Sequence, residues 1–342
     1  MKHRTFFWFI LPTSLAMLLF IALPIVSVVL QSVHAPHEQV ILEVENCDIF
    51  GCKKSTMVDQ DATHALRDAE PLGRFVGSDI YVNRNHLATT QIGAAWQNSN
   101  SVGEFLSALM NLPFYRALAF TLTFTFVVTP LVLILGFMIA VAVNSIPSYL
   151  RGPTIFLSLL PMIITPLIGS LILFWMIDAR GIIGTFIQTV AADPELSMKA
   201  STPLTWLMLI VYGVWHAAPF AFVVYYAGLQ TVPKDTLESA MIDGASRWEQ
   251  IRYVIIPHLI PLTTFITLMQ LMDNFKVFEP IVGFNAAAHA QSLSYYIYDD
   301  LGGETRLLSS AAATSVLTIV GVAILLTPVL IRTWRDFGRS KA

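Results

Sequence analysis

Long apolar runs alternate with short polar segments along almost the whole chain. A helix needs about 20 consecutive, mostly apolar residues to cross the hydrocarbon core of a bilayer. The connecting segments carry the proline, glycine and charged residues that are typical of loops. Six runs are long enough to span a membrane: 6–33, 117–144, 154–177, 204–229, 259–283 and 308–331. The pattern therefore predicts an all-α integral membrane protein with six transmembrane helices.

The composition agrees with a membrane protein. The chain of 342 residues is 55% hydrophobic and only 13% charged, with a mean hydropathy of +0.64. Soluble domains carry about 25% charged residues, so the composition excludes an ordinary soluble protein. The first run follows a basic start, and Val33-His34-Ala35 after it resembles a signal-peptide cleavage site. Signal-peptide apolar cores are about 7–15 residues long, so this longer run predicts an uncleaved first helix.

Lys and Arg in the short loops predict the orientation, because cytoplasmic loops carry an excess of both. If the N-terminus is cytoplasmic, the inner segments hold ten of them: Lys2, Arg4, Arg151, Lys234, Arg247, Arg252, Arg332, Arg335, Arg339 and Lys341. The short outer loops then hold three: Arg180, Lys199 and Arg306. We therefore expect both termini and the loop 230–258 to face the cytoplasm.

The polar segment between the first two runs is expected to form an extracytoplasmic insert. It holds both cysteines, Cys47 and Cys52, in a compartment that permits disulfides. The spacing favours a small disulfide ring over two free thiols, and metal binding is disfavoured because no further Cys or His lies at finger-like spacing. The chain then divides into a cytoplasmic start with the first helix (1–33), the insert (34–116), a five-helix core (117–331) and a cytoplasmic tail (332–342).

The loop 230–258 has a pattern of its own. Pro233 stands where a short helix can begin, and Gly244 permits a reversal of the backbone. Asp243 can accept hydrogen bonds from turn amides, and Pro257 is expected to limit a second helical piece. These features predict a helix-turn-helix lying on the membrane surface. An ordinary amphipathic interfacial loop is the alternative.

The spacing in this loop resembles the "EAA" loop of ABC importer permeases. The family pattern is Glu-Ala-Ala, three residues, Gly, nine residues, and Ile-x-Leu-Pro. This chain has Glu238-Ser239-Ala240, Gly244 and Val254-Ile255-Ile256-Pro257 at the same spacing, with Asp243-Gly244-Ala245 as in the longer form of the motif. Three substitutions depart from the pattern: Ser239, Val254 and Ile256.

Further segments resemble the carbohydrate-uptake branch of that family, the maltose and glycerol-phosphate type. They are 114–122 at the start of the second run, 275–281 and 292–298. The branch often has Gly-Gly-Pro between the last two, where this chain has Gly283-Phe284-Asn285-Ala286. The resemblance covers residues 100–335, and the cysteine-containing insert lies outside it.

The resemblance implies a permease subunit that forms half of a translocation pathway and works by alternating access in a bacterial inner membrane. Its expected partners are a second permease subunit in a heterodimer, two ATPase subunits and an extracytoplasmic substrate-binding protein. ATP and Mg²⁺ are expected on the ATPase, because this sequence has no phosphate-binding loop; the subunit is then not an enzyme. The residues expected to couple it to the ATPase are Glu238, Ser239, Ala240, Asp243, Gly244, Ala245 and Pro257.

Polar residues within membrane spans are costly and tend to be functional. Amide and carboxylate groups suit the hydroxyls of a sugar, and the resemblance points to the fifth run. The expected substrate-pathway residues are Thr267, Gln270, Asp273, Asn274 and, in the fourth run, Tyr225. An ion pair of Lys276 with Asp273 or Glu279 is the structural alternative for these charges. His216 is expected to bond a neighbouring helix.

Two other classes of protein compete with this interpretation. A secondary transporter driven by an ion gradient commonly has internal repeats and broken helices, and the sequence shows no repeat. A membrane-embedded enzyme needs a metal or nucleophile motif, and none stands out.

Overall fold

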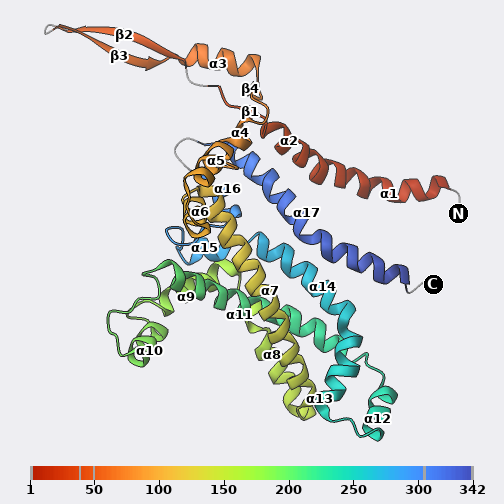
Figure 1. The fold of residues 1–342 in the computed structure, drawn as a ribbon. Coiled ribbons are helices and arrows are strands. Elements are labelled where there is room, and N and C mark those ends of the chain that lie inside the picture. The colour runs from red at the N-terminus through yellow and green to blue at the C-terminus, as the bar shows by residue number, and fades with distance from the viewer. Residues whose placement is uncertain (1–2, 38–39, 49–50, 303–305, 340–342) are drawn as a thin grey trace. The chain divides into compact units, whose positions relative to one another are not determined.

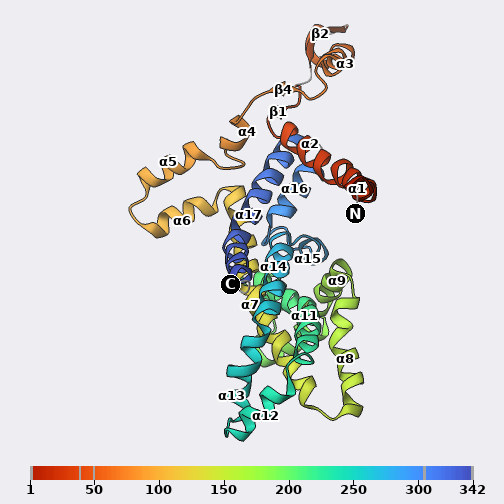
Figure 2. The same ribbon diagram turned by 90° about the vertical axis from the view of Figure 1, so that its right-hand side faces the viewer.

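The computed structural model describes residues 3–37, 40–48, 51–302 and 306–339. It divides into two compact units, each described by itself (Figures 1 and 2). Unit 1 contains residues 1–115 and 296–319, and unit 2 contains residues 116–295 and 320–342. The chain is mostly helical, as the apolar runs predict.

Unit 1 begins with a long apolar helix whose membrane-length part is Phe6–Gln31. It consists of α1 (His3–Met17), a π-helical turn η1 (Leu18–Ala22) and α2 (Leu23–Gln31). The polar insert follows with α3 (Gln60–Ala69), α4 (Asp79–Val82), α5 (Thr89–Asn98) and α6 (Val102–Met110). The unit also includes most of α16 (Leu293–Gly302) and the beginning of α17 (Leu308–Arg339).

The insert contains strands, which were not predicted from the sequence. β1 (His34–Ala35) pairs with β4 (Arg74–Phe75), and β2 (Ile41–Asp48) pairs with β3 (Gly51–Val58), both antiparallel. Cys47 and Cys52 are directly opposite in the register of the second pair. Opposed residues of antiparallel strands have Cα atoms about 4.5–5.5 Å apart, which suits a disulfide. Their side chains lie outside the described residues, so the disulfide stays a prediction.

Unit 2 holds the core helices. They are α7 (Pro113–Ser145), α8 (Ser148–Ile163), α9 (Pro166–Met176), α10 (Ile182–Ala191), α11 (Thr202–Leu229), α12 (Lys234–Ile242), α13 (Arg247–Gln250), the π-helical turn η2 (Ile251–Ile255), α14 (Ile256–Phe275) and α15 (Glu279–Gly283). Over the described residues, five helices are long and apolar enough to cross a membrane, and α8 with α9 can form a sixth, bent span. These six elements correspond to the six predicted runs.

The third span is broken, although the sequence predicts one continuous helix there. The chain bends by 93° between α8 and α9. Thr165, at the break, has φ −63° and ψ 146°, an extended conformation. The residue before a proline is pushed away from the helical region by the proline ring, and Pro166 follows Thr165. The run 154–177 is therefore two helices and not one.

The predicted fifth span, 259–283, was wrong at its C-terminal end. α14 ends at Phe275, and the amide of Lys276 turns back to the carbonyl of Asp273 at 3.2 Å. The segment 276–278 is not helical, and the separate short helix α15 begins at Glu279. Pro280 lies in the first turn of α15, a position that favours proline.

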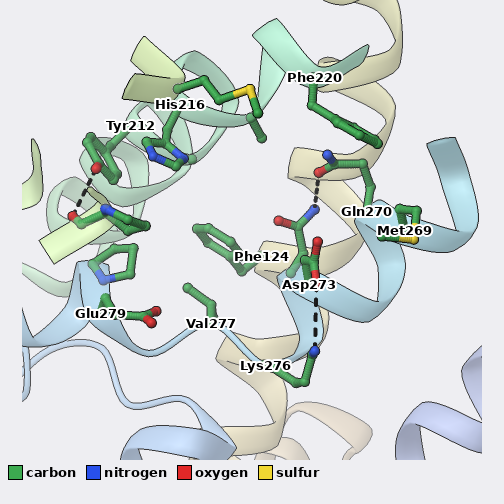
Figure 3. A pocket seen from close by; sticks show the side chains of 16 residues that line it. Phe124, Tyr212, His216, Phe220, Met269, Gln270, Asp273, Lys276, Val277 and Glu279 are labelled. Carbon is green, nitrogen blue, oxygen red and sulfur yellow. Dashed lines mark hydrogen bonds and ion pairs between the residues drawn. The ribbon is translucent and has the colours of Figure 1, made fainter. Parts of the chain in front are cut away.

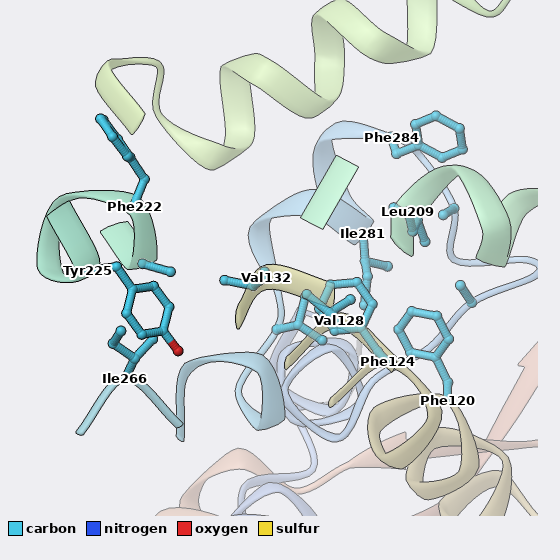
Figure 4. Close-up of a cluster of buried hydrophobic side chains, with 14 of the residues drawn as sticks. Phe120, Phe124, Val128, Val132, Leu209, Phe222, Tyr225, Ile266, Ile281 and Phe284 are labelled. Atoms are coloured by element: carbon cyan, nitrogen blue, oxygen red, sulfur yellow. The ribbon is translucent and has the colours of Figure 1, made fainter. Parts of the chain in front are cut away.

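The core of unit 2 depends on close approaches between helices (Figure 4). Phe120, Phe222 and Ile266 are each at most 1% exposed. A β-carbon on Gly136 of α7 would lie 2.6 Å from the β-carbon of Ala221 in α11. Small residues at such crossings let membrane helices pack closely. The contact fixes α7 against α11, and these two helices form part of the site described next.

Candidate functional site

A cavity of about 470 Å³ lies among the helices of unit 2 (Figure 3). It is lined by residues of α7, α8, α9, α11, α14 and α15 and of the segment between the last two. Of the predicted pathway residues, the cavity brings together Gln270, Asp273 and Asn274. All three come from the last two turns of α14, where spacings of three and four residues place side chains on one face.

The buried polar part of the wall is an amide pair on α14. Gln270 and Asn274 are 5% and 7% exposed. The Asn274 amide nitrogen donates to Oγ1 of Thr129 on α7 at 3.0 Å and to Oε1 of Gln270 at 3.4 Å. Figure 3 shows the second of these bonds at the cavity wall. Amides can donate and accept at once, so this pair can exchange hydrogen bonds with hydroxyl groups of a solute.

The charged part of the wall is more exposed. Asp273 Oδ1 lies 3.6 Å from Nζ of Lys276, and both side chains are more than half exposed. This is the i,i+3 pair expected as the structural alternative. Glu279, in the first turn of α15, adds a second carboxylate to the lining. An exposed pair of this kind adds about 0–1 kcal/mol to stability, so these charges are available to a solute.

Two aromatic side chains of α11 hold the break between α8 and α9 at the cavity wall. Tyr212 donates its hydroxyl to the carbonyl of Pro166 at 2.9 Å, and His216 Nε2 lies 3.0 Å from the carbonyl of Ile164. The two rings stack with centroids 5.7 Å apart. A break in a membrane helix is tolerated where neighbouring groups satisfy the freed backbone. The predicted role of His216, bonding a neighbouring helix, is confirmed.

The other two predicted pathway residues do not line this cavity. Thr267 donates its hydroxyl to the carbonyl of Thr263 in its own helix at 2.7 Å. Tyr225 is only 3% exposed and donates to Oγ1 of Thr263 at 3.1 Å, beside a separate apolar hollow. Tyr212 was not predicted from the sequence. Its spacing of four residues from His216 places the two on one helix face, which was the available signal.

A second candidate site is the loop from α12 to α13. α12 ends in a Schellman motif: the Ala245 amide donates to the Ala240 carbonyl at 2.9 Å, and the Gly244 amide to the Met241 carbonyl at 3.1 Å. Gly244 has φ +82°, the left-handed conformation that this motif needs. The predicted turn at Gly244 is confirmed. The Asp243 amide donates to the Ser239 carbonyl at 3.0 Å.

The next helix starts directly after this turn with a capping box. The Ser246 hydroxyl accepts from the Glu249 amide at 3.3 Å, and a Glu249 carboxylate oxygen accepts from the Ser246 amide at 2.7 Å. The sequence Ser-x-x-Glu is a known signal for a helix start, and it was not among the predicted features. Together the two motifs fix the angle between α12 and α13 by local hydrogen bonds alone.

The expectation that Pro257 limits the second helical piece was wrong. The helix runs from Arg247 to Phe275 through the proline. The π-helical turn before it places the Ile256 amide on the Ile251 carbonyl, five residues back. The wider turn removes the clash that a proline ring makes with the preceding turn. Pro257 therefore lies in the first turn of α14 and is exposed.

The coupling residues that the sequence predicted lie on a protruding surface. Glu238, Ser239 and Asp243 are exposed. Large apolar side chains flank the turn: Ile242 is 85% exposed and Trp248 is 65% exposed. Figures 1 and 2 place α12 at the end of unit 2 that is opposite to α15.

Bundled membrane helices, a cavity among them with polar side chains in part of its wall, and a protruding helical loop define the class of a multi-pass membrane permease. A model of the family described as "Binding-protein-dependent transport system inner membrane component" matches residues 197–334. This stretch includes the loop between α12 and α13, all of α14, and the residues that α11 contributes to the cavity wall.

Curated relatives give the same result. The "sn-glycerol-3-phosphate transport system permease protein UgpA" of Agrobacterium fabrum is 26% identical over 250 residues, which is 70% of this chain and 83% of that protein. The "Trehalose/maltose transport system permease protein MalF" of Thermococcus litoralis is 27% identical over 231 residues, 63% of this chain and 73% of that protein.

A solved structure of a bacterial ABC transporter involved in the import of the acidic polysaccharide alginate shows the same fold. One chain matches with a TM-score of 0.59 and 22% identity, over 73% of this chain and 88% of its own length. Together the matches identify this chain as a permease subunit of a binding-protein-dependent ABC importer. The predicted family is confirmed, and the subunit is not an enzyme, because ATP hydrolysis in this family belongs to a separate chain.

Proposed function

We propose that this permease subunit carries a polyhydroxylated solute, a sugar or sugar derivative, through the cavity lined by Gln270, Asp273 and Asn274. The observation that carries the proposal is the amide pair Gln270–Asn274, buried yet part of the cavity lining. Burying an amide is costly unless it is hydrogen-bonded, and a solute hydroxyl can supply such bonds. Phe124, Tyr212 and Phe220 add aromatic faces. The names of UgpA and MalF, a glycerol-phosphate and a disaccharide permease, support this solute class.

The energy input is proposed to enter at the loop between α12 and α13. The Schellman motif and the capping box make this loop stiff, and its exposed apolar side chains Ile242 and Trp248 need a partner surface. A cleft of a cytoplasmic ATPase, bound to ATP and Mg²⁺, is the partner that we propose. Glu238 then pairs with a basic group of that subunit, and closure of two ATPase subunits moves α11 and α14.

The proposed orientation places both termini and this loop in the cytoplasm. The lysine and arginine count supports it, and so does the arrangement of unit 2, in which α12 and the turn between α7 and α8 lie at one end and α15 at the other (Figure 1). A second permease subunit completes the pathway, and an extracytoplasmic binding protein delivers the solute. The solved complex of a bacterial alginate ABC transporter with an alginate pentasaccharide-bound periplasmic protein, which has a similar fold, supports such a partner.

The test is transport by the complete importer in proteoliposomes, with radiolabelled maltose and glycerol 3-phosphate as probes. We expect uptake that requires ATP and the binding protein, and that falls in Asn274→Ala and Gln270→Ala. Thr264→Ala is the control, because the Thr264 hydroxyl is exposed and bonds only the carbonyl of Ile260 among the described residues. Uptake by this chain alone, without ATP, would support an ion-gradient-driven carrier and refute the proposal.

A further inference from the structure

A buried histidine of the insert, His86, contacts the beginning of α17. Its surface is 0% exposed. Nδ1 lies 3.0 Å from Oδ1 of Asn83, and Nε2 lies 3.1 Å from the hydroxyl of Thr314 in the second turn of α17. Nε2 is also 3.1 Å from the carbonyl of Ser310, one turn earlier. A side chain from the polar insert thus contacts the first turns of a predicted membrane span.

The neutral form of His86 that carries its proton on Nδ1 fits Asn83 and Thr314. Oδ1 of Asn83 only accepts, so Nδ1 carries the proton, and Nε2 then accepts a hydrogen bond from the Thr314 hydroxyl. The Ser310 carbonyl can accept a bond only from a protonated Nε2. A protonated imidazole cannot accept from the Thr314 hydroxyl, and it places a charge in a buried site. Protonation therefore exchanges the bond from Thr314 for one to Ser310 and adds a buried charge.

The segment that carries His86 is held by side chains from several other elements of unit 1. The segment 79–88 ends at Ala88, which is 0% exposed and has φ +45°. Tyr81, within the segment, donates its hydroxyl to Oγ of Ser32 at 2.6 Å. Two tyrosines from other elements donate to backbone carbonyls of the segment: Tyr115 to Leu87 at 2.9 Å and Tyr296 to Asn85 at 3.0 Å. The segment therefore connects the adjoining ends of α2, α7, α16 and α17.

We infer that His86 is a pH-sensitive positioning residue of the permease: as a neutral imidazole it locks the segment 79–88 onto α17, and protonation releases that segment. On the orientation proposed above, the pH in question is that of the extracytoplasmic side. Nothing in the transport proposal requires this lock, and none of the residues that form it is among those that line the solute cavity.

The charged groups around His86 set the pH at which the lock opens. Burial keeps the pKa of His86 below its ordinary value, and it outweighs the Ser310 carbonyl and the carboxylate of Asp300 on α16, which both favour the protonated form. Burial also raises the pKa of Asp300, and the neighbouring Asp299 adds to this rise. Asp300 Oδ2 is buried without a hydrogen-bond partner among the described residues. Tyr115 and Tyr296, which bond the same segment, carry phenol groups, and phenols ordinarily titrate at about pH 10.

The test follows the mobility of the segment with a nitroxide label. Arg84→Cys places the label on an exposed position of the segment, in a background where Cys47 and Cys52 are replaced by serine. The purified full-length chain in detergent is titrated from pH 8 to pH 4.5 and measured by electron paramagnetic resonance. We expect the nitroxide to be immobilised at high pH and mobile at low pH. The midpoint of this transition should lie below pH 6.5, the ordinary pKa of histidine.

Three substitutions separate a titrating lock from a merely structural contact. His86→Asn should remove the transition, Asp300→Asn should move the midpoint to lower pH, and Thr314→Val should move it to higher pH. His64→Asn is the control, because His64 is an exposed histidine of the same insert. A label whose mobility does not change with pH, a transition that persists in His86→Asn, or a midpoint that neither Asp300→Asn nor Thr314→Val moves would overturn the inference.

A functional readout completes the test. The assembled importer is reconstituted in vesicles with ATP inside, and ATP hydrolysis is measured while the outer pH is lowered. We expect the wild-type rate to change across the midpoint of the mobility transition and the His86→Asn rate to lose that change. Equal pH profiles for the two proteins would refute a positioning role. The detergent titration does not depend on orientation or on the solute, so its failure is distinct from failure of the transport proposal.

Discussion

Asn274 on α14 donates a hydrogen bond to the hydroxyl of Thr129 on α7 at 3.0 Å, inside the wall of the cavity. This bond joins two helices that are 145 positions apart in sequence and orients the amide toward Gln270. The same hydrogen bond therefore holds α14 against α7 and fixes the direction of a polar group in the cavity wall.

Removing the Thr129 hydroxyl should destabilise this wall. Thr129→Val leaves a buried amide donor of Asn274 without its partner, which costs about 1–3 kcal/mol. We expect a lower melting temperature in detergent and weaker solute-dependent ATP hydrolysis by the importer. Thr129→Ser keeps the hydroxyl and should restore most of both. Equal melting of the valine and serine variants would contradict the role of the hydrogen bond.

Gly244→Ala tests the geometry of the loop between α12 and α13, where we propose that the ATPase binds. A β-carbon there meets nothing within 4 Å, so the substitution acts only through the left-handed conformation at φ +82°. That conformation costs a non-glycine residue about 1–2 kcal/mol. We expect reduced binding of the ATPase and a lower ratio of transport to ATP hydrolysis, with Gly244→Asn less affected.

The matched control for that variant is Gly152→Ala. A β-carbon on Gly152 also meets nothing within 4 Å, but the residue lies inside α8 and its φ is not positive. Alanine should be neutral or stabilising there by about 0.5–1 kcal/mol. A binding assay in which both alanine variants behave alike would show that the turn at Gly244 has no special role.

Gly136→Ala should separate α7 from α11. The new methyl group would lie 2.8 Å from the amide nitrogen of Phe222 and 2.6 Å from the β-carbon of Ala221. Relief of this clash requires a shift of the α11 backbone. Overpacking of this kind costs about 1–3 kcal/mol. The prediction is a lower melting temperature in detergent. Gly93→Ala, where no atom lies within 4 Å, should melt like the wild type.

Asp273→Asn should change solute preference more than stability. The pair with Lys276 spans 3.6 Å and is exposed, so its loss costs at most about 1 kcal/mol. The substitution removes a carboxylate from the cavity and frees Lys276. Uptake of glycerol 3-phosphate relative to maltose should then rise, measured as a ratio in proteoliposomes. An unchanged ratio would mean that Asp273 does not face the solute.

Acid should weaken unit 1 through His86. Its pKa is lower in the folded protein than the ordinary 6.5, because burial disfavours the charged form. Between those two values the unfolded chain binds more protons, so stability is complete above about pH 6.5 and falls as the pH decreases toward the folded pKa. The raised pKa of Asp300 acts in the opposite direction, at pH values above its ordinary 3.8. His86→Asn should flatten the melting temperature between pH 7 and pH 5.5, whereas His64→Asn should not.

The membrane class, the six apolar runs and the turn at Gly244 could all be predicted from the sequence alone. Apolar length and Lys/Arg placement are properties of single segments, and a left-handed glycine followed by Ser-x-x-Glu specifies a loop through bonds between residues a few positions apart. The family identification also followed from such local spacing.

Which polar residues meet depends instead on how distant helices pack. Gln270, Asp273 and Asn274 line a cavity because α7 and α11 pack against α14, while Tyr225, equally polar in sequence, is buried in a different contact. Pro166 causes the break at Thr165 locally, but the carbonyls beside the break are bonded by the side chains of Tyr212 and His216, which lie 46 and 52 positions away in sequence. His86 has the sequence surroundings of an ordinary loop residue for the same reason: its partners on α17 are more than 220 positions distant. Hydropathy records whether a residue prefers lipid or water, but burial and hydrogen-bond partners are set by contacts between segments far apart in the chain.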